Sequence, residues 1–139
     1  MTTLHLHIQI VGALQIALAL AHTAFTRRFN WKEETARLSL LNRQIFYVHT
    51  VFICVVLTLF GLLSLFCTDE LLMRSRLAKF VLAGITSFWA LRWLFQFFVY
   101  DSRLWKGNRF NTNVHIIFSA VWTYFGCVYG AALWNQINS

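Results

Sequence analysis

The sequence contains few charged residues and no proline. Of its 139 residues, 12% are charged and 58% are hydrophobic, and there are only three cysteines and six glycines. Soluble domains carry about 25% charged residues, and a soluble chain this short could not bury so much apolar surface. The same composition excludes an intrinsically disordered chain, a disulfide scaffold and a nucleic-acid-binding module. We therefore expect a protein that is surrounded by lipid.

Four long apolar stretches fill most of the chain. They cover residues 8–25, 45–67, 78–100 and 113–134, and each has close to the roughly 20 residues that a helix needs to cross a bilayer. Backbone groups in hydrocarbon must pair within their own segment, so each stretch is predicted to be a helix. The sequence shows no repeat and no linker rich in proline, glycine or serine. It therefore predicts one transmembrane domain over residues 1–139, an all-α integral membrane four-helix bundle.

The lysines and arginines predict the orientation of the four spans. Two loops that share one side, 26–44 and 101–112, hold eight of these residues, and the other side holds three. Because cytoplasmic loops are enriched in Lys and Arg, we expect a multi-pass protein of the plasma (inner) membrane with both termini outside. The eight are Arg27, Arg28, Lys32, Arg37, Arg43, Arg103, Lys106 and Arg109, and the three are Arg74, Arg76 and Lys79.

Two loop segments carry helix-start signals. Asn30 followed by Glu33 fits a capping box and predicts a short interfacial helix in the first cytoplasmic loop, with a solvated charged loop as the alternative. Thr68, which precedes two acidic residues, is predicted to cap a helix that runs through Arg76 into the third span. The apolar face of the interfacial helix would carry Trp31, Leu38, Leu41 and Ile45.

Polar residues within the spans predict a site near the cytoplasmic side. At 1.5 Å per residue, four of them lie roughly 3 to 6 Å inside the cytoplasmic ends of their spans, and two lie deeper, at roughly 12 to 15 Å. The shallow tier consists of His22, His49, Gln96 and His115, and the deeper tier consists of Gln15 and Arg92. We predict that these six residues line one intramembrane site.

Arg92 is the most informative of the six. A charge at the centre of a membrane helix costs at least about 2.5 kcal/mol, so such residues usually face an interior cavity. The spans contain no Asp or Glu, and Asp101 is roughly 13 Å away along the helix axis. The partners left open are backbone carbonyls, Gln15, water, the faces of Trp89, Trp93 or Trp122, or an anionic group of a ligand. The alternative is an arginine whose side chain extends to the interface.

His22, His49 and His115 predict a metal or haem site. Imidazoles from different helices of a bundle can coordinate zinc, iron, copper or haem, and they can also relay protons. No span contains an HxxH, HxxxH or ExxH motif or a carboxylate. The alternative is therefore that these histidines are interfacial hydrogen-bonding residues.

These features lead to two main hypotheses for function. The first is a small membrane protein that binds haem, a transition metal or a quinone-like lipid for redox chemistry. Whether it would be an enzyme is left open. The second is a non-enzymatic accessory or scaffold subunit of a larger membrane complex. An oligomeric proton or ion channel is a weaker third hypothesis, because the chain has no inverted repeat. The expected partners are the bilayer, a lipid-soluble ligand, and further copies or other subunits, but no nucleic acid.

Overall fold

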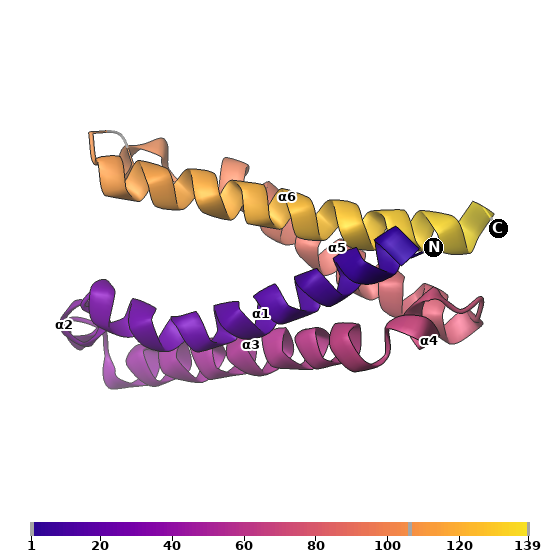
Figure 1. Cartoon of the computed structure of the whole chain (residues 1–139). Coiled ribbons are helices and arrows are strands. Elements are labelled where there is room, and N and C mark those ends of the chain that lie inside the picture. Colours follow the sequence, from indigo (N-terminus) through magenta and orange to yellow (C-terminus); the bar gives the residue numbers. More distant parts are fainter. Residues whose placement is uncertain (1, 106, 139) are drawn as a thin grey trace. The chain divides into compact units, whose positions relative to one another are not determined.

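The computed structural model describes residues 2–105 and 107–138, and within these ranges it is all-helical (Figure 1). Four of the helices are long and apolar enough to cross a membrane. This confirms the all-helical fold with four long apolar helices. Lys106, one of the predicted cytoplasmic cations, lies outside the described residues. In chain order the elements are α1 (Thr2–Arg28), α2 (Trp31–Ala36), α3 (Leu40–Phe66), α4 (Thr68–Leu72), α5 (Arg76–Phe98), the short 3-10 helix η1 (Ser102–Leu104) and α6 (Arg109–Asn138).

The chain divides into two compact units. We name Gln9–Thr68 the central unit, which holds most of α1 together with α2 and α3. Met1–Ile8 and Asp69–Ser139 form the terminal unit, which holds the start of α1, most of α4, and α5 and α6.

In the central unit, α1 and α3 approach closely at two glycines. A Cβ atom added to Gly12 would lie 2.8 Å from the carbonyl oxygen of Gly61, and one added to Gly61 would lie 2.8 Å from the carbonyl oxygen of Gly12. Larger residues would force the two backbones apart. Small residues are the usual means by which membrane helices come into such contact.

The first loop contains the predicted short helix, but the prediction that a capping box begins this helix is wrong. Asn30 adopts a left-handed conformation with φ 47°, and its side chain makes no capping hydrogen bond. Instead, its backbone carbonyl accepts from the amides of Glu33 and Glu34, at 3.0 and 3.1 Å. The helix also ends at Ala36, so the predicted apolar stripe is divided between α2 and α3.

The predicted continuous helix from Thr68 through Arg76 is also wrong. Thr68 is itself the first residue of α4, and its hydroxyl donates back to the carbonyl of Ser64 at 2.6 Å. Helix α4 ends at Leu72, and α5 begins at Arg76. Ser75 caps α5, because its hydroxyl accepts from the amide of Ala78 at 3.0 Å.

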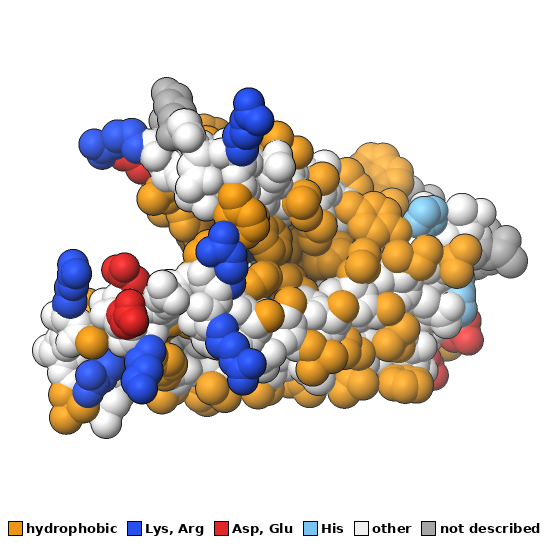
Figure 2. All heavy atoms as spheres, turned by 60° about the vertical axis from the view of Figure 1, so that its left-hand side comes forward, with side chains coloured by type: hydrophobic (Ala, Val, Ile, Leu, Met, Phe, Trp, Pro, Cys, Tyr) orange, Lys and Arg blue, Asp and Glu red, His pale blue; other side chains and the backbone are white. Residues whose placement is uncertain are grey.

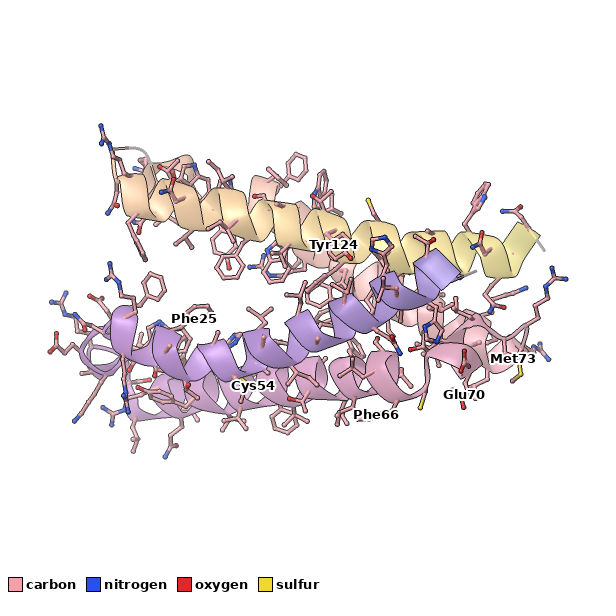
Figure 3. The ribbon with its side chains drawn as sticks, viewed as in Figure 1. Phe25, Cys54, Phe66, Glu70, Met73 and Tyr124 are labelled. Carbon is pink, nitrogen blue, oxygen red and sulfur yellow. The ribbon has the colours of Figure 1, made fainter. Side chains whose placement is uncertain are left out.

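In the terminal unit, α5 and α6 form an antiparallel pair with an aromatic core. The buried ring of Trp89 stacks on Trp122, with centroids 5.2 Å apart, and meets Phe125 edge-on at 4.7 Å. The first turns of α1 attach to this pair, since His7 Nδ1 and the hydroxyl of Tyr124 are 2.8 Å apart (Tyr124 is labelled in Figure 3). Near the C-terminal end of α6, Gln136 donates to the carbonyls of Leu71 and Met73.

The outer faces of the long helices are strongly apolar. Figure 2 shows hydrophobic side chains spread over their surfaces, and Phe66 and Phe98 are 77% and 79% exposed. Soluble monomers rarely leave such large apolar patches in contact with water. The surface therefore favours a lipid bilayer as the surroundings of these helices.

Candidate functional site

Arg92 lies on α5, and its side chain extends toward the C-terminal end of that helix. Its Nη1 donates to Oε1 of Gln96, one turn further along, at 3.2 Å. Its Cζ lies 4.8 Å from the ring centroid of Trp122 and 5.6 Å from that of Tyr100. Helical side chains generally lean toward the N-terminus of their helix, so this arginine extends against that tendency. Its direction agrees with the interfacial alternative, and its contact with Trp122 agrees with one of the predicted partners.

Gln96 connects the polar groups of α5 and α6. Its side chain is buried, and its Oε1 accepts from Arg92 and from Nε1 of Trp122, at 3.2 and 3.3 Å. Its Nε2 donates to Nδ1 of His115 at 2.7 Å. Guanidinium and indole nitrogens can only donate, which establishes the orientation of the amide. Nδ1 of His115 is therefore an acceptor, and the proton of the neutral ring is on Nε2.

Aromatic rings hold the imidazole of His115 in place. The ring of Trp105 stacks on it, with centroids 3.9 Å apart and planes 13° apart, and Phe97 meets it edge-on at 5.9 Å. The carbonyl of Trp105 accepts from the Thr112 hydroxyl at 2.8 Å, which anchors this part of the loop to α6. His115 is thus restrained by a hydrogen bond on one edge and by aromatic contacts.

Within the described part of the chain, no carboxylate lies within ion-pair distance of Arg92. Asp101 instead pairs with Arg103, whose Nη2 and Nε lie 2.6 and 2.9 Å from Oδ2. This hydrogen-bonded pair raises the pKa of Arg103 above its ordinary value. The charge of Arg92 is therefore compensated by one amide oxygen and two ring faces.

Arg92 and His115 lie at one level, whereas the sequence placed them in different tiers. Helix α5 ends at Phe98, so Arg92 is roughly 9 Å from that end along the axis. Helix α6 begins at Arg109, so His115 is also roughly 9 Å inside its helix. The predicted depths were measured from the ends of the apolar stretches, and these ends differ from the ends of the helices.

We name Arg92, Gln96, Tyr100, His115 and Trp122 the Arg92 site. It lies entirely within the terminal unit and brings together three of the six residues that the sequence predicts. The predicted residues among its members are Arg92, Gln96 and His115.

The other three predicted residues belong to the central unit. Gln15 is fully buried. His22 is half-buried and His49 is exposed, and Nδ1 of each lies 2.8 Å from a carbonyl of the preceding turn, that of Leu18 and that of Ile45. These two histidines therefore each bond to their own helix.

The described residues do not form a cluster of metal-ligating side chains. Among residues 2–105 and 107–138, no group of three or more His, Cys, Asp or Glu side chains could hold a metal ion. Haem or metal binding by His22, His49 and His115 therefore stays a prediction from the sequence. The groups that the structure does assemble at the Arg92 site offer positive charge and hydrogen-bond donors.

The stacking of Trp105 on His115 was not predicted from the sequence. Trp105 lies in the connection between α5 and α6, where helical periodicity gives no guide to its neighbours. By sequence it is a residue of an interfacial aromatic belt, because tryptophan is common at that depth. The signal that could have pointed to it is the shortness of the loop, which returns the chain to the start of α6 about two turns before His115.

Comparisons with known protein families, with curated proteins and with solved structures found no match to this chain. The function is therefore inferred from the geometry and chemistry of the site.

Proposed function

We propose that this chain is a small multi-pass membrane protein that binds an anionic, lipid-soluble ligand at the Arg92 site. One observation carries the proposal. A guanidinium on an apolar helix has a single hydrogen-bond acceptor and no carboxylate partner among the described residues. A carboxylate or phosphate oxygen of an amphiphile would supply the missing negative charge.

The energetics support an anion at this position. The guanidinium stays ionised in proteins and has five N–H donors, of which Gln96 accepts from one. Cation-π contacts contribute about 0.5 to 2 kcal/mol each, which offsets only part of the cost of placing a charge in an apolar region. The contacts with Gln96 and Trp122 also hold the guanidinium in place, so little ordering entropy is lost when a ligand binds.

A quinone-like lipid is a second candidate ligand. The observation that favours it is that the guanidinium of Arg92 and the imidazole of His115 both bond to Gln96, since neutral carbonyl oxygens accept from N–H groups of these two kinds. This ligand would retain the redox role that the sequence suggests. The anion is preferred because a carbonyl oxygen does not neutralise the charge of Arg92.

Fluorescence quenching of the intact protein can test the proposal. The site contains Trp122 and adjoins Trp105, so a brominated fatty acid that binds there quenches tryptophan emission. We expect saturable quenching by dibromostearate, with Kd increased about tenfold or more in Arg92→Gln, equivalent to about 1.4 kcal/mol. Arg92→Lys should be intermediate, because it keeps the charge and loses the planar fork. Arg103→Gln is the matched control, since Arg103 is exposed and pairs with Asp101.

Three outcomes would contradict the anionic form of the proposal. The first is equal affinity of Arg92→Gln and the unaltered protein for dibromostearate. The second is equal binding of the uncharged methyl ester of this acid. The third is saturable, Arg92-dependent binding of a decyl-substituted benzoquinone without binding of the acid, which would favour the quinone-like ligand. If neither probe saturates, the scaffold hypothesis is preferred.

A further inference from the structure

A groove of about 500 Å³ lies between α1 and α3 in the central unit. Its walls come from residues 19–26 of α1 and residues 47–59 of α3, so all of it lies on the α2 side of the contact between Gly12 and Gly61. Cys54, labelled on α3 in Figure 3, is one of the small residues that leave this space open, together with Ala19 and Thr58. The groove shares no residue with the Arg92 site.

The groove is apolar although several of its residues have polar groups. The hydroxyls of Thr50 and Thr58 donate to the carbonyls one turn earlier, at 2.9 and 2.8 Å. Nδ1 of His22 bonds in the same way to the carbonyl of Leu18. Because these groups are paired within their own helices, they offer the groove few free donors or acceptors. A hydrocarbon chain fits such a surface better than a polar ligand does.

The length of the groove matches one leaflet of a bilayer. From Tyr47 to Leu59, α3 rises roughly 18 Å. Half of a hydrocarbon core about 30 Å thick is about 15 Å. One acyl chain of a lipid in a single leaflet would therefore run along the whole groove.

Positive charge lies at the loop end of the groove. A second hollow, which shares Thr23 with the groove, is lined by Arg27 and Arg28 of the last turn of α1. The central unit has five basic residues and two acidic ones, Glu33 and Glu34, so its loop end has an excess of positive charge. The five basic residues are Arg27, Arg28, Lys32, Arg37 and Arg43.

We propose that the groove holds an acyl chain of an anionic phospholipid, with the phosphate at Arg27 and Arg28. The apolar lining selects the hydrocarbon chain, the length selects one leaflet, and the two arginines select an anionic headgroup. The site is independent of the proposed function, because it uses only residues of the central unit.

Photolabelling of the full chain in vesicles can test this site. The vesicles would consist of phosphatidylcholine with a small fraction of a probe lipid that has a diazirine on its acyl chain. In one sample the probe lipid is phosphatidylglycerol, and in the other it is phosphatidylcholine. We expect the phosphatidylglycerol probe to label Val51 and Val55, which line the groove, at least about threefold more than the phosphatidylcholine probe does. Phe52 and Leu62, which are exposed on α3 but do not line the groove, should show no such preference.

Two double variants separate charge recognition from general lipid contact. Arg27→Gln with Arg28→Gln should reduce labelling by the phosphatidylglycerol probe to the level of the phosphatidylcholine probe. Arg74→Gln with Arg76→Gln, which removes two arginines of the terminal unit, should leave labelling unchanged.

The proposal would be overturned by any of three results. These are equal labelling by the two probes, uniform labelling around α3, and full labelling of the Arg27→Gln, Arg28→Gln variant. Cross-linking of the groove to a second copy of the chain would show that a protein occupies it. If the double variant does not fold, competition on the unaltered protein decides. Unlabelled phosphatidylglycerol must then displace the probe better than phosphatidylcholine does.

Discussion

At the scale of single residues, Gln96 is the side chain on which the arrangement of the Arg92 site depends. Its amide oxygen accepts from two obligate donors, Arg92 and Trp122, and its amide nitrogen donates to His115. A buried group with three partners is costly to replace, because each partner then loses a hydrogen bond.

Two substitutions of Gln96 should separate stability from ligand binding. Gln96→Leu leaves the indole of Trp122 and the guanidinium of Arg92 without this acceptor, and should lower the free energy of unfolding by about 1 to 3 kcal/mol. Gln96→Glu keeps acceptors for Arg92 and Trp122 but removes the N–H that His115 accepts from. Its carboxylate also neutralises Arg92, so the protein should stay folded while its affinity for dibromostearate falls. Thermal unfolding in detergent and the quenching titration measure the two effects.

Gln44→Leu is the control for these variants, because Gln44 is exposed in the second turn of α3. It should leave both the stability and the affinity unchanged. Tighter binding of the fatty acid by Gln96→Glu than by the unaltered protein would contradict the view that Arg92 supplies the positive charge for the ligand.

At the scale of elements, the starts of the helices depend on individual capping groups. The hydroxyls of Ser39 and Ser75 accept from the amides of Asn42 and Ala78, which begin α3 and α5. Asn30 begins α2 through its backbone carbonyl. Such details follow from φ and ψ at one residue, which the residue types alone predict poorly.

The contact between α1 and α3 should be sensitive to a single methyl group. In Gly12→Ala, the new Cβ would lie 2.8 Å from the carbonyl oxygen of Gly61 and 2.9 Å from Cβ of Ser64. Neither group can move without separating the helices, so we expect a loss of about 1 to 3 kcal/mol in the free energy of unfolding. Equilibrium unfolding in mixed micelles would measure it.

Gly84→Ala is the matched control for this substitution. Gly84 lies within α5, and an added Cβ would meet nothing within 4 Å. Alanine should therefore stabilise that helix by about 0.5 to 1 kcal/mol, because glycine loses more backbone entropy on folding. A Gly12→Ala protein as stable as Gly84→Ala would show that the close approach of the two backbones contributes nothing.

At the scale of the whole molecule, the distribution of basic residues predicts the topology. The loops 26–44 and 101–112 carry most of the arginines and lysines, so we expect four spans to leave both termini outside. A reporter that is active only in the cytoplasm should stay silent when fused after the last residue of the chain. The same reporter inserted in the first loop, between α2 and α3, should be active. Activity at the C-terminus with silence in the loop would reverse the orientation.

Much of the fold could be predicted because it depends on local properties. The apolar stretches identified the four long helices, since hydrocarbon surroundings require each segment to satisfy its own backbone. The ends of those helices could not be predicted as well. All four helices begin before their apolar stretches, whereas α3 and α5 end one or two residues before theirs. The start of α5 depends on a local cap at Ser75.

One contact of the candidate site could be predicted for the same reason. Helical spacing placed Gln96 four residues after Arg92, so their hydrogen bond is a local consequence of the helix. The bond between Gln96 and His115 crosses from α5 to α6, and the stacking of Trp105 on His115 depends on the loop between them. Spacing along one helix carries no information about either contact.

By itself, the sequence determined the helical character, the number of long apolar segments and the asymmetry of charge, because each depends on residue type and run length. Only the tertiary structure decided which polar groups meet. The rotation of α5 against α6 brings Gln96 to His115 and Trp122, and it follows from how the rings of Trp89, Trp122 and Phe125 pack. Packing of this kind joins residues far apart in the chain, so no local pattern encodes it.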